Sequence, residues 1–238
     1  MEFILLLLVG MGAAFVQRVS GFGLGIFAMS FLPHILPTHT AAAAISSLFS
    51  CVTTTYNSIR YRRSIAFKTA VPMIGAALVT ITVAVRFAAV VPGDVFKLLL
   101  GGVLILMSLY FIFFNQKVKI RATVTNGLIA GSLGGVLGGL FSTGGPPAVL
   151  YMSNAVEDNL VYFATVQFYF CFTNLYATFN RAISGILTWQ VLLYAAVGVV
   201  GCLVGDLIGG KVFDKLDGKA LKKVIYIGMI ISGVLMFF

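Results

Sequence analysis

Long apolar runs follow one another along this chain, with only short polar connections between them. Runs near 20 residues are long enough to cross the hydrocarbon core of a bilayer as α-helices. The eight apolar segments are 3–32, 39–59, 67–87, 95–114, 122–155, 160–180, 188–210 and 220–238. This pattern predicts an all-α polytopic membrane protein that consists of a single integral membrane domain.

The first and fifth segments are longer than one straight helix needs, and a glycine-rich break interrupts each of them. The first break reads Gln-Arg-Val-Ser-Gly-Phe-Gly-Leu-Gly at 17–25, and the second reads Ser-Thr-Gly-Gly-Pro-Pro at 142–147. A broken helix at membrane depth is costly unless it lines a cavity, because lipid cannot satisfy the freed backbone groups. Two breaks, one in each half of a chain, are typical of a secondary transporter whose substrate site lies at the breaks.

The two halves of the chain resemble each other. Residues 8–32 align with 129–153, and this alignment places Gly23 on Gly144. The order of features is kept although few residues are identical, and a duplicated transporter half is the usual explanation. The predicted transmembrane repeats are 1–116 and 117–238.

Charge adds the orientation. Only 10% of the residues are charged and 60% are hydrophobic, which excludes a soluble domain, and the formal net charge is +9. The basic residues gather in loops at 60–68, 117–121 and 211–223. Basic residues accumulate in cytoplasmic loops and contact anionic lipid, so we expect all three loops in the cytoplasm and no nucleic-acid partner. The expected location is the plasma (inner) membrane, crossed several times.

The three basic loops can share one side of the membrane only if the fifth segment enters and leaves on the same side. A re-entrant hairpin around the second break gives this topology, and by analogy the first segment does the same. Each repeat then has one broken or re-entrant helix plus three transmembrane helices. Because three crossings are an odd number, the two repeats are predicted to be inverted.

The second break has the features of an anion site. Ser142 or Thr143 can cap a short helix that begins near Gly145, and prolines are tolerated in its first turn. The free N–H groups and the dipole at such a helix end attract anions, and Gly144 leaves the backbone open to a ligand. The alternative is that the glycines and Pro146 only form a packing kink.

In the first break, Gly21 and Gly23 can free the backbone in the same way. Arg18 lies in the same apolar segment, and a charged side chain there is by default a functional hypothesis. It pairs with an oxyanion if the hairpin tip lies at mid-depth, and otherwise its long side chain reaches the membrane interface. Gln17 and Ser20 are neutral donors on the same turn.

The second and sixth segments follow the breaks, so their polar residues are expected to line the same cavity or to bond between helices. The candidate substrate-binding residues are Gln17, Arg18, Ser20, Gly21, Phe22, Gly23, Tyr56, Asn57, Ser142, Thr143, Gly144, Gly145, Pro146, Gln167, Asn174 and Tyr176. Asp206, in the seventh segment, is expected to make a local pair or to serve the helix end, with proton coupling as the alternative.

Nothing in the chain suggests catalysis. No metal-ligand spacing, cofactor motif or activated nucleophile is recognisable, and the three cysteines are dispersed in apolar segments. We therefore expect neither an enzyme nor a bound metal or cofactor. The glycines spaced by four at 201–209 and 131–139 are expected to be close-packing surfaces.

At its two breaks the chain resembles the sulfite exporter TauE/SafE family of membrane permeases. The matching motifs are Gln17-x-x-Ser20-Gly21-Phe22-Gly23 and a Gly-x-x-x-Gly stretch followed by Ser-Thr-Gly-Gly-Pro-Pro. The resemblance covers essentially the full length and implies export or uptake of sulfur-containing anions such as sulfite, sulfoacetate and other organosulfonates. Arg18 departs from the family pattern, in which a small or apolar residue is common at this position.

We therefore predict a secondary transporter that exports a small sulfur-containing anion by alternating access at the two broken helices. The expected partners are this anion and the lipid bilayer, while proton coupling and a homodimer stay open. The alternatives are a passive anion channel and a membrane subunit that scaffolds a larger complex.

Overall fold

The computed structural model describes residues 2–114, 120–212, 230, 233, 234 and 236. In this part of the chain the regular elements are all helical. They are α1 (Glu2–Ser20), α2 (Leu24–Ile35), α3 (His39–Arg60), η1 (Arg62–Ser64), α4 (Phe67–Val90), α5 (Gly93–Phe114), α6 (Val124–Phe141), α7 (Gly145–Ala155), α8 (Asn159–Ile183) and α9 (Trp189–Val212). The predicted segment 220–238 and the basic residues at 117, 119, 215, 219, 222 and 223 lie wholly or largely outside the described residues.

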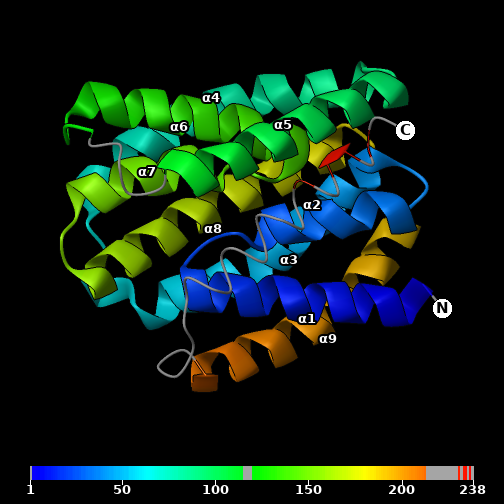
Figure 1. The fold of residues 1–238 in the computed structure, drawn as a ribbon, viewed down its shortest axis with the longest axis horizontal. Coiled ribbons are helices and arrows are strands. Elements are labelled where there is room, and N and C mark those ends of the chain that lie inside the picture. Colours follow the sequence, from blue (N-terminus) through cyan, green and yellow to red (C-terminus); the bar gives the residue numbers. More distant parts are fainter. Residues whose placement is uncertain (1, 115–119, 213–229, 231–232, 235, 237–238) are drawn as a thin grey trace.

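Helix length and composition confirm the predicted fold class of an all-α polytopic membrane protein. Among the described residues, five helices are long and apolar enough to cross a membrane, namely α1, α4, α5, α6 and α9. α3 and α8 have 22 and 25 residues and are more polar, and they run through the middle of the bundle (Figure 1). α2 and α7 have only 12 and 11 residues, so each is about 18 Å long or less.

The two expected breaks are present, and the backbone explains both. Gly21 and Gly23 have φ values of 80° and 98°, in the left-handed region that glycine enters without strain. At the second break Ser142 has φ 58°, the one positive value at a non-glycine residue in the described part of the chain. The half-helix predicted near Gly145 begins at that residue. Its N-cap is Gly144, so the prediction that Ser142 or Thr143 caps it is wrong.

Glycine faces hold the outer helices together in two pairs. α9 lies along α1, where a β-carbon on Gly201 or Gly205 would collide with the carbonyl oxygens of Leu7 and Met11. α6 lies along α4 in the same way, with Gly131 against the backbone of Met73. The prediction of close-packing glycine surfaces is confirmed. Each pair joins the two predicted repeats: α1 of the first repeat packs on α9 of the second, and α6 of the second repeat packs on α4 of the first. α1 and α6 are the long helices that precede the two breaks, and we call them the arms.

The central pair α3 and α8 separates these two outer pairs, as Figure 1 shows with α4 and α6 above and α1 and α9 below. Its contacts include small polar side chains. The hydroxyls of Ser47 and Thr178 lie 3.1 Å apart, and the Thr55 hydroxyl lies 3.4 Å from the Cys171 thiol. All three cysteines are free and buried, in line with a packing role.

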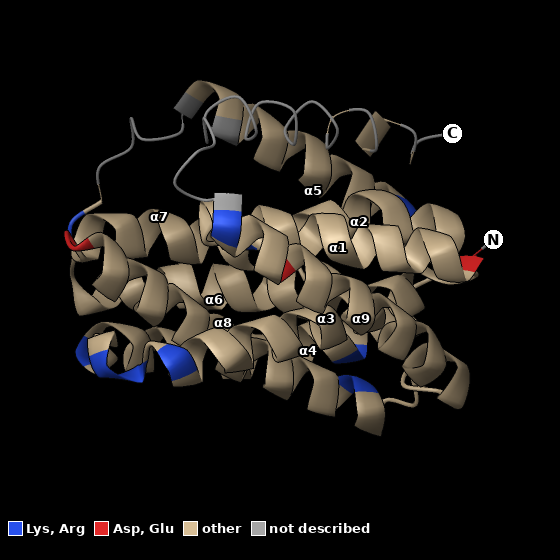
Figure 2. Ribbon diagram, turned by 90° about the horizontal axis from the view of Figure 1, so that it is seen from below, with Lys and Arg blue, Asp and Glu red and all other residues tan. Residues whose placement is uncertain are grey.

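Basic positions are unevenly distributed along the bundle. Figure 2 shows blue ribbon gathered at the end opposite the N-terminus, and fewer blue positions at the other end. The turn from α3 to α4, with Arg62 and Arg63 in η1, lies at this basic end. The cytoplasmic location of these loops, the inverted relation of the halves and the division at 116/117 stay predictions.

Candidate functional site: a cavity where two broken helices meet

The two breaks are about 120 residues apart in sequence, and they meet in the fold. A β-carbon on Gly25, in the first turn of α2, would collide with the carbonyl of Ser142. The Phe22 ring would lie 3.5 Å from a β-carbon on Gly145, the first residue of α7. The short helices α2 and α7 therefore begin beside each other, each with its positive dipole end toward the same point.

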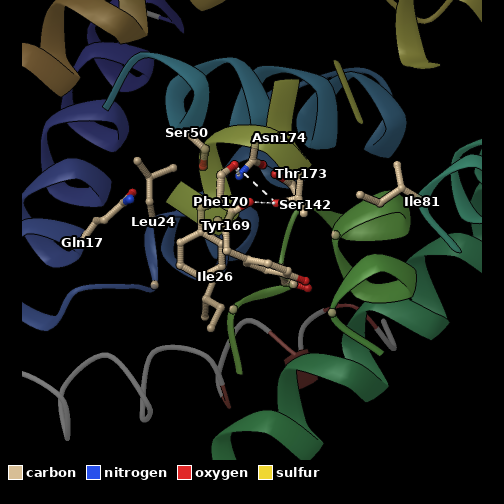
Figure 3. A pocket seen from close by; sticks show the side chains of 17 residues that line it. Gln17, Leu24, Ile26, Ser50, Ile81, Ser142, Tyr169, Phe170, Thr173 and Asn174 are labelled. Carbon is tan, nitrogen blue, oxygen red and sulfur yellow. Dashed lines mark hydrogen bonds between the residues drawn. The ribbon is translucent and has the colours of Figure 1, made fainter. Parts of the chain in front are cut away.

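A cavity lies at this junction (Figure 3). The space within it that is open to the centre of a water-sized sphere is about 40 Å³. This exceeds the roughly 10–15 Å³ that one water molecule needs on the same measure. The cavity is lined by Gln17, Gly23, Leu24, Gly25, Ile26, Ser50, Ile81, Gly134, Gly138, Ser142, Thr143, Gly144, Gly145, Tyr169, Phe170, Thr173 and Asn174. None of these side chains is charged at neutral pH, so the polar character of the wall comes from hydroxyls, amides and backbone.

Two hydroxyls in the wall have no hydrogen-bond partner. Ser142 and Thr143 are 7% and 2% exposed, and neither Ser142 Oγ nor Thr143 Oγ1 is bonded. Ser46 Oγ, which is also unpartnered, would lie 3.7 Å from a β-carbon on Gly25. Buried hydroxyls are nearly always hydrogen-bonded because an orphaned one costs free energy. These three atoms therefore mark the second break as a place for a polar ligand or water.

The helix ends at the cavity offer unequal sets of N–H groups. The first N–H groups of a helix have no intrahelical partner, and in α2 they belong to Leu24, Gly25 and Ile26, all of which line the cavity. In α7 the corresponding positions after Gly145 are Pro146 and Pro147, which have no N–H. Backbone donors thus come mainly from α2, and hydroxyl donors come from the second break.

An amide pair ties the first break to α8. Gln17 Nε2 donates to Gln167 Oε1 at 3.0 Å, and Gln167 Nε2 donates to the Gly21 carbonyl at 2.9 Å. The Thr53 hydroxyl donates to Gln17 Oε1 at 3.4 Å. Each amide is thus oriented by the next, and the left-handed backbone at Gly21 is fixed by a side chain from the other half of the protein.

Arg18 lies apart from the cavity. Its Nη1 donates to Asn57 Oδ1 at 2.9 Å and its Nη2 donates to the Tyr61 hydroxyl at 3.4 Å. It lines a separate open depression of about 460 Å³, together with Tyr56, Arg60, Asp206 and Lys211 among others. The charged neighbours of Asp206 are Arg18 and Arg60.

The structure places the other predicted residues in three groups. Gln17, Gly23, Ser142, Thr143, Gly144, Gly145 and Asn174 line the cavity. Gly21, Phe22, Pro146 and Gln167 lie next to it and shape its wall. Arg18, Ser20, Tyr56, Asn57 and Tyr176 are engaged elsewhere: Ser20 donates to the carbonyls of Val16 and Phe22, Tyr56 bonds Arg60, and Tyr176 bonds Thr82 of α4.

One charged residue near the cavity was missed by the sequence analysis. Arg181 is 2% exposed, and its Nη2 donates to the carbonyls of Gly138 and Gly139 at 3.0 and 2.9 Å. The apolar segment was expected to end at Asn180, so the arginine appeared to belong to the following loop. α8 continues to Ile183 and carries Arg181 into the protein. Helical continuation of the polar face from Thr173 through Asn180 is the signal that could have found it.

Comparison with known proteins identifies the family of the chain. No curated protein and no solved structure matches the chain. The family model described as Sulfite exporter TauE/SafE matches residues 6–236. The match takes in both breaks, all of α2 to α9 and most of α1, which confirms the resemblance inferred from the two motifs. The chain therefore belongs to the sulfite exporter TauE/SafE family, a family of membrane transporters and not of enzymes.

Proposed function

We propose that this protein is a secondary transporter that exports a small sulfur-containing oxyanion, such as sulfite or an organosulfonate. The anion binds in the cavity between the two broken helices. The observation that carries this proposal is the pair of unpartnered hydroxyls, Ser142 and Thr143, in a buried cavity onto which two helix N-termini converge. Family membership supports the class of substrate.

The chemistry of the wall suits an oxyanion with several acceptor oxygens. N–H groups of α2 and the hydroxyls of the second break are donors that approach from different sides, as a tetrahedral head group requires. No carboxylate lines the cavity, so a bound anion meets no like charge. Apolar neighbours such as Ile26 and Phe170 limit the volume and favour a compact head group.

Alternating access requires the cavity to open to each side in turn. Gln17 lines the cavity and accepts a hydrogen bond from Thr53, which lines the depression at Arg18, so a movement of the Gln17–Gln167 pair would connect the two. At the opposite end, a second depression of about 400 Å³ is lined by Leu36, Ser184 and Tyr194 among others. The cavity wall has no carboxylate or histidine, so a coupled proton would be carried by the substrate itself. Location in the plasma membrane and a homodimer are kept as proposals.

The test is transport by the purified protein in liposomes. We expect saturable uptake of labelled sulfite or sulfoacetate that is accelerated by unlabelled anion on the opposite side, because a carrier returns faster when it is loaded. Flux that grows linearly with concentration and shows no such counterflow would instead establish a passive anion channel. Failure of the purified, folded protein to transport either anion would favour the scaffold alternative.

A further inference from the structure

Arg181 is positioned directly behind the second break. It lies in the last turn of α8, and the two carbonyls that it bonds are those of Gly138 and Gly139 at the end of α6. The Ser142 N–H donates to the same Gly138 carbonyl at 3.0 Å. The guanidinium and the backbone of the break therefore share one acceptor, and Gly138 itself lines the cavity.

In the part of the chain that the structure describes, this buried cation has no opposite charge beside it. Among the described residues no carboxylate contacts Arg181, and its Nη1 has no hydrogen-bond partner. The carbonyl end of α6 carries a partial negative charge, which offsets part of the cost of burial. A fully charged group that is buried without an ionic partner remains unfavourable, and at membrane depth it is a sign of function.

The cavity has no charged side chain of its own, and the nearby Arg181 has a positive charge without an ionic partner among the described residues. The cavity contains orphaned hydroxyls but no charged side chain, while the cation one carbonyl away lacks a counter-charge. In a medium of low dielectric constant, a charge acts over several ångströms without direct contact. Arg181 therefore adds a full positive charge to the partial charges of the helix ends at the cavity, whereas Arg18, which is bonded to Asn57 and Tyr61, faces the separate depression.

We propose that Arg181 is a positioning residue that makes the cavity selective for anions, with the bound anion as its missing counter-charge. This proposal rests on the proposed function, because it assigns the source of charge in the same site. It differs from a purely structural role, in which Arg181 would only hold the carbonyls of α6 in place at the break.

The two roles can be separated by the charge of the ligand. Sulfate and methanesulfonate both present tetrahedral oxyanions, with two charges and one charge respectively. Since Coulomb energy is proportional to ligand charge, removal of the Arg181 charge should weaken sulfate binding by about the square of the factor for methanesulfonate. A break that is merely distorted would weaken both by a similar factor.

The experiment is titration calorimetry of both anions with the purified wild-type protein and with Arg181→Gln, Arg181→Lys and Arg18→Gln. For Arg181→Gln we expect losses of roughly tenfold for methanesulfonate and roughly a hundredfold for sulfate. Arg181→Lys should recover much of the affinity for both, and Arg18→Gln should bind both as the wild type does. Thermal unfolding identifies folded variants, and Arg181→Met replaces the glutamine variant should that one fail to fold.

The outcomes separate this inference from the proposed function. Unchanged affinities in the neutral Arg181 variant, or equal fold losses for both anions, would overturn the role of Arg181 while leaving the cavity as the site. A wild-type protein that binds neither anion would overturn the proposed site, and the role of Arg181 with it.

Discussion

The two breaks share one backbone plan but differ in the chemistry that they offer to a ligand. The first supplies free N–H groups from α2 and is held by the amides of Gln17 and Gln167. The second loses two N–H groups to prolines and supplies the hydroxyls of Ser142 and Thr143. The two breaks thus give one cavity two different walls, one of backbone donors and one of side-chain donors.

The arginines of the two halves differ in the same way. Arg18 extends from the first arm, α1, to the side chains of α3. Arg181 extends from the span after the second break, α8, back to the carbonyls of the second arm, α6. The first arginine bonds neutral groups and lies near Asp206 in an open depression, whereas the second is buried with one nitrogen unpartnered. Under our proposal for Arg181, the charge that attracts an anion to the cavity belongs to the second half.

The largest effect on anion binding is expected at glycines in the cavity wall that pack directly against backbone carbonyls. Gly25→Ala places a β-carbon against the Ser142 carbonyl, and Gly144→Ala places one against the Gly134 carbonyl. Either should abolish anion binding, because backbone rather than a flexible side chain must shift. Gly75→Ala is the matched control, since a β-carbon there has nothing within 4 Å. If the folded Gly25→Ala protein binds the anion as tightly as the wild type, the close contact between the two breaks is not needed for binding.

The hydroxyl wall should show opposite effects on binding and on stability. Thr143→Val keeps the shape of the side chain and removes an unpartnered hydroxyl. Anion binding should weaken by about 0.5–1.5 kcal/mol, while the empty protein unfolds at the same or a higher temperature. Calorimetric binding and a thermal melt without ligand test both halves of the prediction. A lower melting temperature with intact binding would make the hydroxyl a structural group.

The amide pair should behave as a unit. Gln17→Leu and Gln167→Leu should each destabilise the folded protein by roughly 1–3 kcal/mol, because each leaves a buried amide partner unsatisfied. The double variant should cost less than the sum of the two singles. Denaturant or thermal unfolding of the four proteins gives the coupling. Strict additivity would mean that the two amides do not depend on each other.

The smallest effect on the cavity is expected at the first arginine. Arg18→Gln should change anion affinity less than about twofold, because Arg18 does not line the cavity and the removed charge faces the separate depression. Calorimetry with methanesulfonate measures this. A tenfold loss would place Arg18 in the binding site after all and would make the two halves electrostatically alike.

Both breaks could be located from the sequence because glycine and proline change the backbone conformation within a few residues of their own position. The start of α7 at Gly145 and the close packing of the glycine faces followed from such local rules. The partners of Arg18, Gln17 and Arg181 did not, because they depend on how each helix is rotated about its axis. The N-cap at Gly144 was also missed, since Ser142 adopts a left-handed conformation and neither hydroxyl bonds the helix end.

The glycine contacts between α1 and α9, and between α4 and α6, have a mechanical consequence. Most of these contacts place backbone against backbone, which a change of side-chain rotamer cannot relax, so we expect each pair to move as one rigid unit. The two helix pairs cut across the two predicted repeats, because each pair contains one helix from each predicted repeat. A rocking motion that opens the cavity would then change the contacts between α3 and α8. Hydroxyl and thiol groups lie there, and they can exchange hydrogen-bond partners as the two outer pairs tilt.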